Sequence, residues 1–221
     1  MSVLSVADAA EELGVSGRRV RQLLESGELV GQQLGRAWVI ERAAIDRLRP
    51  KRVGRPWSAA SAWAVLELAA GRDPELSPVE RSRARKRLAG SGLAGLVDQL
   101  QSRSERREMY AHPSALDRVG DDADIVRSGV SALGFYNVDL IVSDEAEVYV
   151  RSSKLAGLMD GYALQSNPDR SNLVVRVVDD GVWPFVDDAR VAPWPVVAVD
   201  LLDSDDERSR RAGLELIERH R

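Results

Sequence analysis

Apolar side chains recur at helical spacing in two short segments near the start of the chain, residues 7–13 and 16–25. Only Gly14 and Val15 lie between these segments, and Ser16 stands at the N-cap position of the second. Two helices joined by so tight a glycine-containing turn predict a helix-turn-helix. The positions expected to face inward are Val6, Ala9, Ala10, Leu13, Val20, Leu23 and Leu24.

The segment that follows has the pattern of a two-stranded hairpin. Residues 29–34 and 37–40 read as strands, and Gly35-Arg36 forms the turn between them. Residues 41–48 then predict a short closing helix with Ile45 and Leu48 inward. A hairpin directly after the second helix is expected to act as a wing, with Arg36 at its tip.

Helical signals dominate residues 58–107. Ser58 caps a predicted helix that extends to Ala70, and a second helix begins at Ser77-Pro78-Val79-Glu80, which combines a cap, a proline and a capping-box glutamate. That helix is expected to end at Leu88 or Ala89, and residues 93–107 predict a third.

Short strands and helices alternate after residue 107. Residues 147–151 and 173–178 predict strands, and the second is so apolar and β-branched that we expect burial on both faces. Helices are expected at residues 113–118, 128–133 and 152–159, with a final helix at 208–220 behind the acids Asp205-Asp206-Glu207.

These patterns together predict an α+β protein with four segments. A winged helix-turn-helix occupies residues 1–50, and a basic linker with two prolines and a glycine occupies 51–57. The helical middle section covers 58–107, and an acidic α+β domain covers 108–221.

Charge is distributed unevenly, although the whole chain carries only −4. Residues 1–57 carry +3 and residues 58–111 carry +2, whereas residues 112–221 carry −9. The first half therefore suits a phosphate backbone, and the last half would be repelled from it unless it is turned away.

The amino-acid composition excludes several kinds of functional site. Cysteine does not occur, so disulfides and thiolate metal sites are excluded and a cytoplasmic location is expected. His112 and His220 lie far apart, and neither has a metal-ligand neighbour at helical spacing. No run of about 18 apolar residues occurs, so we expect no membrane partner, and we expect no metal or cofactor.

One face of the second helix is polar and basic. Arg18, Arg21 and Gln22 share it at i, i+3 and i+4, with Arg19 beside them. Arginine can hold guanine bidentately and glutamine can hold adenine, so this face suits a DNA groove. A solvated basic face is the alternative, and the tight turn and the wing favour DNA. The candidate DNA-binding residues are Ser16, Arg18, Arg19, Arg21, Gln22, Arg36, Arg52 and Arg55.

Two further basic stretches leave alternatives open. Gly54-Arg55-Pro56 partly resembles the core of a minor-groove AT-hook, with Val53 in place of its first arginine; the alternative is a basic tether that adds phosphate contacts together with Arg52. The helix after Ser77 carries five basic residues between positions 81 and 87, which read either as a solvated face or as a second DNA contact.

The first fifty residues resemble the excisionase-type branch of MerR-like winged helix-turn-helix domains. The resemblance rests on Leu4-Ser5-Val6-Ala7-Asp8-Ala9-Ala10, Leu13-Gly14-Val15-Ser16, residues 20–29 and Leu34-Gly35-Arg36-Ala37-Trp38-Val39-Ile40. It implies that the second helix enters the major groove and that the wing touches the backbone. It assigns those roles to Arg18, Arg19, Arg21, Gln22 and Arg36.

Residues 124–221 resemble the C-terminal half of the AbiEi family, the antitoxins of type IV toxin–antitoxin operons. The resemblance rests on residues 148–151, 162–164, 172–177 and 196–213, whereas the head is excisionase-like instead of the family's usual type. It implies an autorepressing antitoxin whose partner is a nucleotidyltransferase-like toxin. The alternative is an architectural, excisionase-like DNA-binding factor of a phage or mobile element. In either case we expect homo-oligomers on double-stranded DNA, because one small head covers little DNA.

Catalysis is not expected. Asp122-Ala123-Asp124 has the Asp-x-Asp form of nucleotidyltransferases, but Asp122 lies 31 positions after Ser91 of the Gly90-Ser91 pair. Those enzymes hold the two elements about ten residues apart, so a capping cluster is the preferred interpretation of these aspartates. The two histidines are too poorly placed for a Ser/His/Asp arrangement, and no glycine-rich phosphate loop follows a strand.

Overall fold

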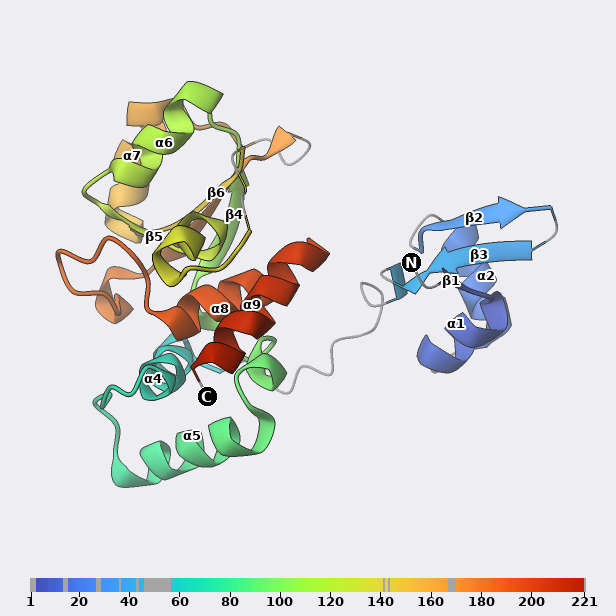
Figure 1. Cartoon of the computed structure of the whole chain (residues 1–221), viewed down its shortest axis with the longest axis horizontal. Coiled ribbons are helices and arrows are strands. Elements are labelled where there is room, and N and C mark those ends of the chain that lie inside the picture. The colour runs from blue at the N-terminus through green and yellow to red at the C-terminus, as the bar shows by residue number, and fades with distance from the viewer. Residues whose placement is uncertain are drawn as a thin grey trace. The chain divides into compact units, whose positions relative to one another are not determined.

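The computed structural model describes residues 3–13, 16–26, 29–35, 37–42, 44–45, 57–140, 142, 144–166 and 170–220. The chain divides into two compact units, Met1–Val53 and Gly54–Arg221, each described here by itself (Figure 1). The fold class is α+β, as predicted.

The first unit combines two helices with a small sheet. Helices α1 (Val6–Leu13) and α2 (Gly17–Glu25) match the two predicted helices. Strands β2 (Gly31–Leu34) and β3 (Ala37–Glu41) pair antiparallel and confirm the hairpin. The sequence pattern missed β1 (Val3–Leu4), which adds to the other edge of β3 and is only two residues long.

Local hydrogen bonds explain where both helices begin. The Ser5 hydroxyl accepts from the Asp8 amide at 3.2 Å, and the Asp8 carboxylate accepts from the Ser5 amide at 3.0 Å, which forms a capping box. The Ser16 hydroxyl accepts from the Arg19 amide at 3.3 Å. The residues buried between the helices and the sheet are Ala9, Val20, Leu23, Leu24, Leu29, Ile40, Ala44 and Ile45.

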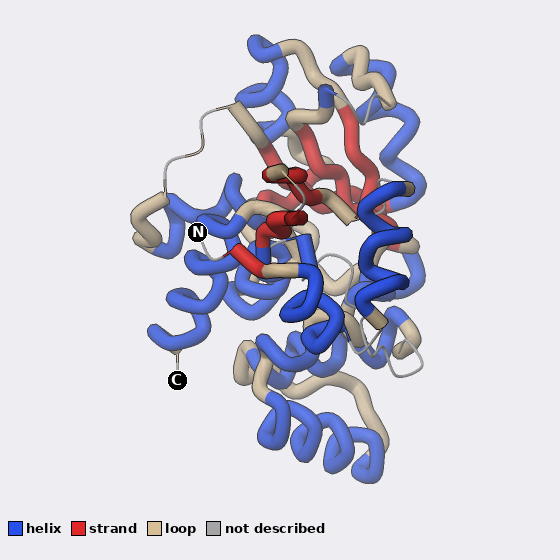
Figure 2. The backbone as a smooth tube through the Cα atoms, turned by 90° about the vertical axis from the view of Figure 1, so that its right-hand side faces the viewer, coloured by secondary structure: helices blue, strands red, loops and turns tan. Residues whose placement is uncertain are grey.

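The second unit is built on a four-stranded mixed sheet, whose strands run side by side as red tubes in Figure 2. Its order is β4-β7-β6-β5, where β6 and β7 are parallel and the other pairs are antiparallel. The strands are β4 (Glu105–Met109), β5 (Ile125–Arg127), β6 (Ala146–Arg151) and β7 (Leu173–Val178).

Helices cover both faces of this sheet (Figure 1). Helices α6 (Pro113–Asp121) and α7 (Leu155–Tyr162) bury one face, which receives Val148, Val150 and Val175. The other face, which includes Tyr149, shares a core with α4 (Ala59–Ala69), α8 (Trp194–Leu202) and α9 (Glu207–Arg219), and α9 packs against α8. Because side chains alternate along each strand, neighbouring residues of β6 and β7 belong to two different cores.

Helix α4 joins the middle section to the acidic region. The Trp63 ring lies edge-on to Tyr149 with centroids 5.6 Å apart, and its indole N–H donates to the Arg103 carbonyl at 3.0 Å. The sequence predicted a boundary near residue 107, but one core spans it. Helix α5 (Pro78–Ser91) begins with the predicted capping box, and Gly92, which adopts a φ of 63°, caps its C-terminal end.

The predicted helix over residues 93–107 is wrong. Two 3-10 turns, Ala94–Leu96 and Gln101–Arg103, precede strand β4, which begins at Glu105. Its first residues carry charges that pair along the strand, as between Arg107 and Glu105 at 2.9 Å. Such a charged segment suits a sheet edge, where one side of the strand is unpaired. The predicted helix at 128–133 is instead a 3-10 segment, Gly129–Tyr136.

The Asp180 carboxylate ties the sheet to the start of α7, and this contact predicts a pH dependence. It accepts from the Ser153 hydroxyl at 2.7 Å, the Ser152 hydroxyl at 2.7 Å and the Ser153 amide at 3.0 Å. These hydrogen bonds lower the pKa of Asp180 from 3.8 to about 2. Stability from this group is therefore present above the ordinary pKa and is lost as the pH falls toward 2.

We expect urea denaturation to find wild type more stable than Asp180→Asn by a constant margin above about pH 5, the region where both folded and unfolded carboxyls are ionised. The margin should shrink between pH 4 and pH 2. The matched control is Asp188→Asn, an exposed aspartate with no hydrogen bond to any residue that the structure describes. A margin that stays constant down to pH 2 would contradict the prediction.

Candidate nucleic-acid interface

Helix α2 has a polar side that is exposed to solvent and an apolar side that is buried. Val20 is 0% exposed and lies in the core of the first unit. Arg18, Arg19, Arg21 and Gln22 are all exposed. The helix therefore brings four of the eight predicted DNA-binding residues together on its solvent side, where guanidinium and amide groups can reach base edges or phosphates.

Ser16 has a different place in this surface. Its hydroxyl is the N-cap of α2, so it fixes the helix start from which Arg18 and Arg19 project. The amides of a first helical turn favour anions, which places a phosphate-compatible end beside the basic face. Three further predicted residues, Arg36, Arg52 and Arg55, lie outside the described residues, as do most of the predicted linker and Leu48.

The hairpin is held close to α2 at Gly31. A Cβ added there would lie 2.7 Å from Leu24 Cδ2 and 3.2 Å from the Val39 carbonyl oxygen, so only glycine fits without a shift. Strand β2 continues with Gln32 and Gln33, which are both exposed. Neither residue was predicted as a contact, although two amide side chains in a predicted wing strand were the available signal.

A comparison with family models decides what this unit is. The model for a helix-turn-helix domain matches residues 3–52. The first unit is a helix-turn-helix domain. The match supports the predicted excisionase-type head, and it supports a DNA-binding regulator. No curated protein and no solved structure matches the chain.

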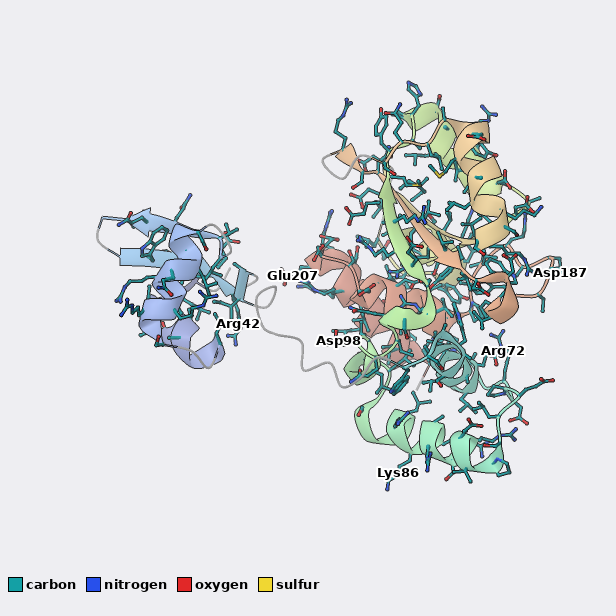
Figure 3. All side chains as sticks on the ribbon, turned by 180° about the vertical axis from the view of Figure 1, so that it is seen from behind. Arg42, Arg72, Lys86, Asp98, Asp187 and Glu207 are labelled. Atoms are coloured by element: carbon teal, nitrogen blue, oxygen red, sulfur yellow. The ribbon has the colours of Figure 1, made fainter. Side chains whose placement is uncertain are left out.

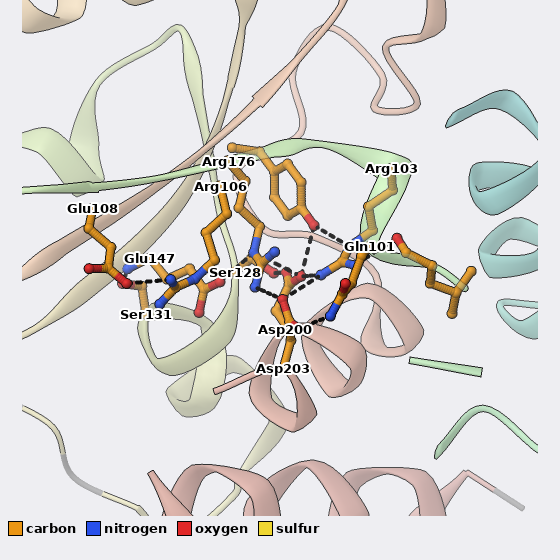
Figure 4. Close-up of polar contacts among 12 residues, drawn as sticks. Gln101, Arg103, Arg106, Glu108, Ser128, Ser131, Glu147, Arg176, Asp200 and Asp203 are labelled. Carbon is orange, nitrogen blue, oxygen red and sulfur yellow. Dashed lines mark hydrogen bonds and ion pairs between the residues drawn. The ribbon is translucent and has the colours of Figure 1, made fainter. Parts of the chain in front are cut away.

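The rest of the chain lies beyond that match, and its most unusual feature is a buried charged cluster between the sheet and α8 (Figure 4). Asp200 of α8 is its centre. Asp200 Oδ1 accepts from Arg103 Nη2 at 2.5 Å and from the Tyr149 hydroxyl at 2.8 Å, and Arg176 Nε lies 3.1 Å from the same oxygen. The Ser128 hydroxyl donates to the other carboxylate oxygen.

Two more carboxylates complete the cluster. Glu147 Oε1 accepts from Arg176 Nε at 2.5 Å, and Asp203 Oδ2 accepts from Arg176 Nη2 at 3.1 Å. Arg103 also donates to the Leu100 carbonyl at 2.8 Å. Both guanidinium groups thus have several partners, as buried charges require.

Burial and charge oppose each other in this cluster. Burial raises the pKa of Glu147, although the nearby Arg176 favours the ionised form. Burial alone would lower the pKa of Arg176, but Asp200 and Glu147 outweigh it and hold the pKa well above its ordinary value. Burial likewise raises the pKa of Tyr149. The groups of this cluster satisfy one another's charges and hydrogen bonds. We therefore interpret the cluster as structural: it holds the sheet against α8.

The aspartates considered for catalysis serve the local structure. Asp122 Oδ1 accepts from the Asp124 amide at 2.8 Å, and its other oxygen accepts from the Tyr162 hydroxyl at 2.9 Å. Asp124 pairs with Lys154 at 3.1 Å. Among the described residues no group of three or more His, Asp or Glu is placed to hold a metal ion. Within the same residues, no helix has the length and apolar character needed to cross a membrane.

Proposed function

We propose that this protein is a sequence-specific transcriptional regulator that represses its own promoter as the antitoxin of a toxin–antitoxin operon. The observation that carries DNA recognition is the exposed set Arg18, Arg21 and Gln22 on the second helix of a helix-turn-helix domain. Arginine and glutamine supply the donors that distinguish guanine and adenine in the major groove. We further propose that the protein acts by binding and not by catalysis, in the cytoplasm and as homo-oligomers on DNA.

The antitoxin role draws its support from the resemblance of residues 124–221 to the AbiEi family. Strands β6 and β7 and helix α8, which contain most of that resemblance, belong to the compact unit Gly54–Arg221, which is distinct from the helix-turn-helix domain. Such a unit is available for a second task. The proposed partner is a nucleotidyltransferase-like toxin encoded beside it.

Footprinting tests the DNA-binding part of this proposal. We expect the purified full-length protein to protect a site in the DNA upstream of its own coding sequence. Supplying the protein in trans should lower expression from a reporter that carries this DNA. Protection of unrelated DNA with equal affinity, or a reporter that does not respond, would contradict sequence-specific autorepression.

The neighbouring gene tests the antitoxin part. A neighbouring nucleotidyltransferase that arrests growth when expressed alone, and that this protein relieves, supports the proposal. A neighbouring recombinase without such relief supports the architectural alternative and overturns the antitoxin role.

A further inference from the structure

Helix α5 carries a dense positive charge on the outside of the second unit. Over Pro78–Ser91 it has five basic residues and one acidic residue. Its single carboxylate, Glu80, is engaged by Ser77 in the capping box, with an oxygen–oxygen distance of 2.6 Å. Arg81 is partly neutralised by Asp73 at 2.9 Å.

Of the four remaining cations, Arg87 lies over the Trp57 ring and the other three face solvent. Arg83, Arg85 and Lys86 are exposed, and none of them has an ion pair or hydrogen bond within the described part of the chain. Ala84 is buried between them, so the helix is anchored through its opposite side. Lys86 points away from the body of the unit in Figure 3. Three exposed cations without a salt bridge therefore lie on the outward side of one helix, and Arg83 also interacts electrostatically with Glu80.

We propose that Arg83, Arg85 and Lys86 form a second DNA contact, which binds backbone phosphates while the helix-turn-helix domain reads sequence. This inference rests on the proposed function. DNA is favoured over a lipid surface because α5 has no free apolar stripe: Ala84 is buried, Leu88 packs against the core, and Val79 is the one exposed large apolar side chain of this helix. Membrane-surface helices need such a stripe to insert.

The position of Trp57 links α5 to the basic linker sequence. Ser102 donates a hydrogen bond to the Trp57 carbonyl, and the Arg87 guanidinium lies 4.9 Å from the centroid of the Trp57 ring. The end of the linker is thereby fixed against α5. A phosphate-binding helix on the same chain as a DNA-bound domain works at high effective concentration.

Charge also orients the second unit. Residues 112–221 carry −9 and would be repelled by phosphates, whereas α5 would be attracted. The unit would therefore approach DNA with α5 foremost.

The test is the salt dependence of binding to the protein's own upstream DNA. Each phosphate contact adds about 0.9 to the slope of log affinity against log salt concentration. We expect the triple variant Arg83→Gln, Arg85→Gln and Lys86→Gln to lower that slope by about 2 to 3, with the footprint unchanged. Affinity should fall by a similar factor on unrelated duplexes. Lys86→Gln alone should lower the slope by about 1.

The control triple variant is Arg118→Gln, Arg208→Gln and Arg211→Gln, which removes the same charge from exposed positions on α6 and α9. Thermal melting by circular dichroism checks that both variants fold. An α5 variant whose slope equals that of wild type, or that of the control, overturns the inference and leaves the proposed function intact. Wild-type protein that fails to protect its upstream DNA refutes the proposed function instead.

Discussion

Asp200→Asn is expected to lower the free energy of unfolding of the second unit by about 3–5 kcal/mol, the range found when one partner of a buried ion pair is removed. The Asp200 side chain is fully buried, and it accepts from Arg103 and Tyr149 and faces Arg176. Asparagine has nearly the same volume but no charge, and its NH2 group cannot accept a hydrogen bond. Two buried guanidinium groups would lose the carboxylate that they share.

Denaturation by urea, followed by tryptophan fluorescence in a Trp38→Phe background, measures this loss. The remaining tryptophans, Trp57, Trp63, Trp183 and Trp194, all belong to the second unit. The matched control is Asp187→Asn, whose side chain is 99% exposed and pairs with Arg151 at 3.1 Å. Exposed ion pairs contribute about 0–1 kcal/mol. A loss for Asp200→Asn no larger than that of the control would show that the cluster does not stabilise the packing of the sheet against α8.

The buried charged cluster could not be predicted from the sequence, for a physical reason. Arg103 and Asp200 are 97 positions apart in the chain, so their pairing depends on the packing of the whole unit. Arg103 falls in the helix predicted over residues 93–107, and arginine usually lies on the protein surface. A signal was nevertheless present: Arg176 and Asp200 each interrupt a strongly apolar run. Opposite charges inside two buried elements can be tolerated only if they meet or find other partners.

Features set by neighbouring residues were predictable. The caps at Ser16, Ser58 and Ser77 all form as expected, because the donor and acceptor lie within three residues of each other. The fold of the helix-turn-helix domain followed from its periodicity for the same reason. Strand β4 was missed because its charged residues carry no alternation, and its pairing with β7 is decided by residues about 70 positions away.

The exposed polar face of α2 leads to the second large effect. Arg18→Ala together with Arg21→Ala is expected to weaken binding to the specific site by about 1–3 kcal/mol per arginine, or about 5- to 150-fold each. Both side chains are exposed and alanine favours helix, so the helix-turn-helix domain should keep its fold. Fluorescence anisotropy on specific and unrelated duplexes measures the loss.

The arginine pair Arg208 and Arg211 provides a close control, because it has the same i, i+3 spacing and lies exposed on α9. Alanine at both of these positions should leave DNA affinity unchanged. Arg18→Lys with Arg21→Lys separates the two kinds of contact, since lysine keeps the charge but loses the bidentate fork. We expect this lysine variant to keep the salt slope and lose base discrimination. If it discriminates bases as wild type does, the arginines hold phosphates and sequence reading must come from Gln22 or the wing.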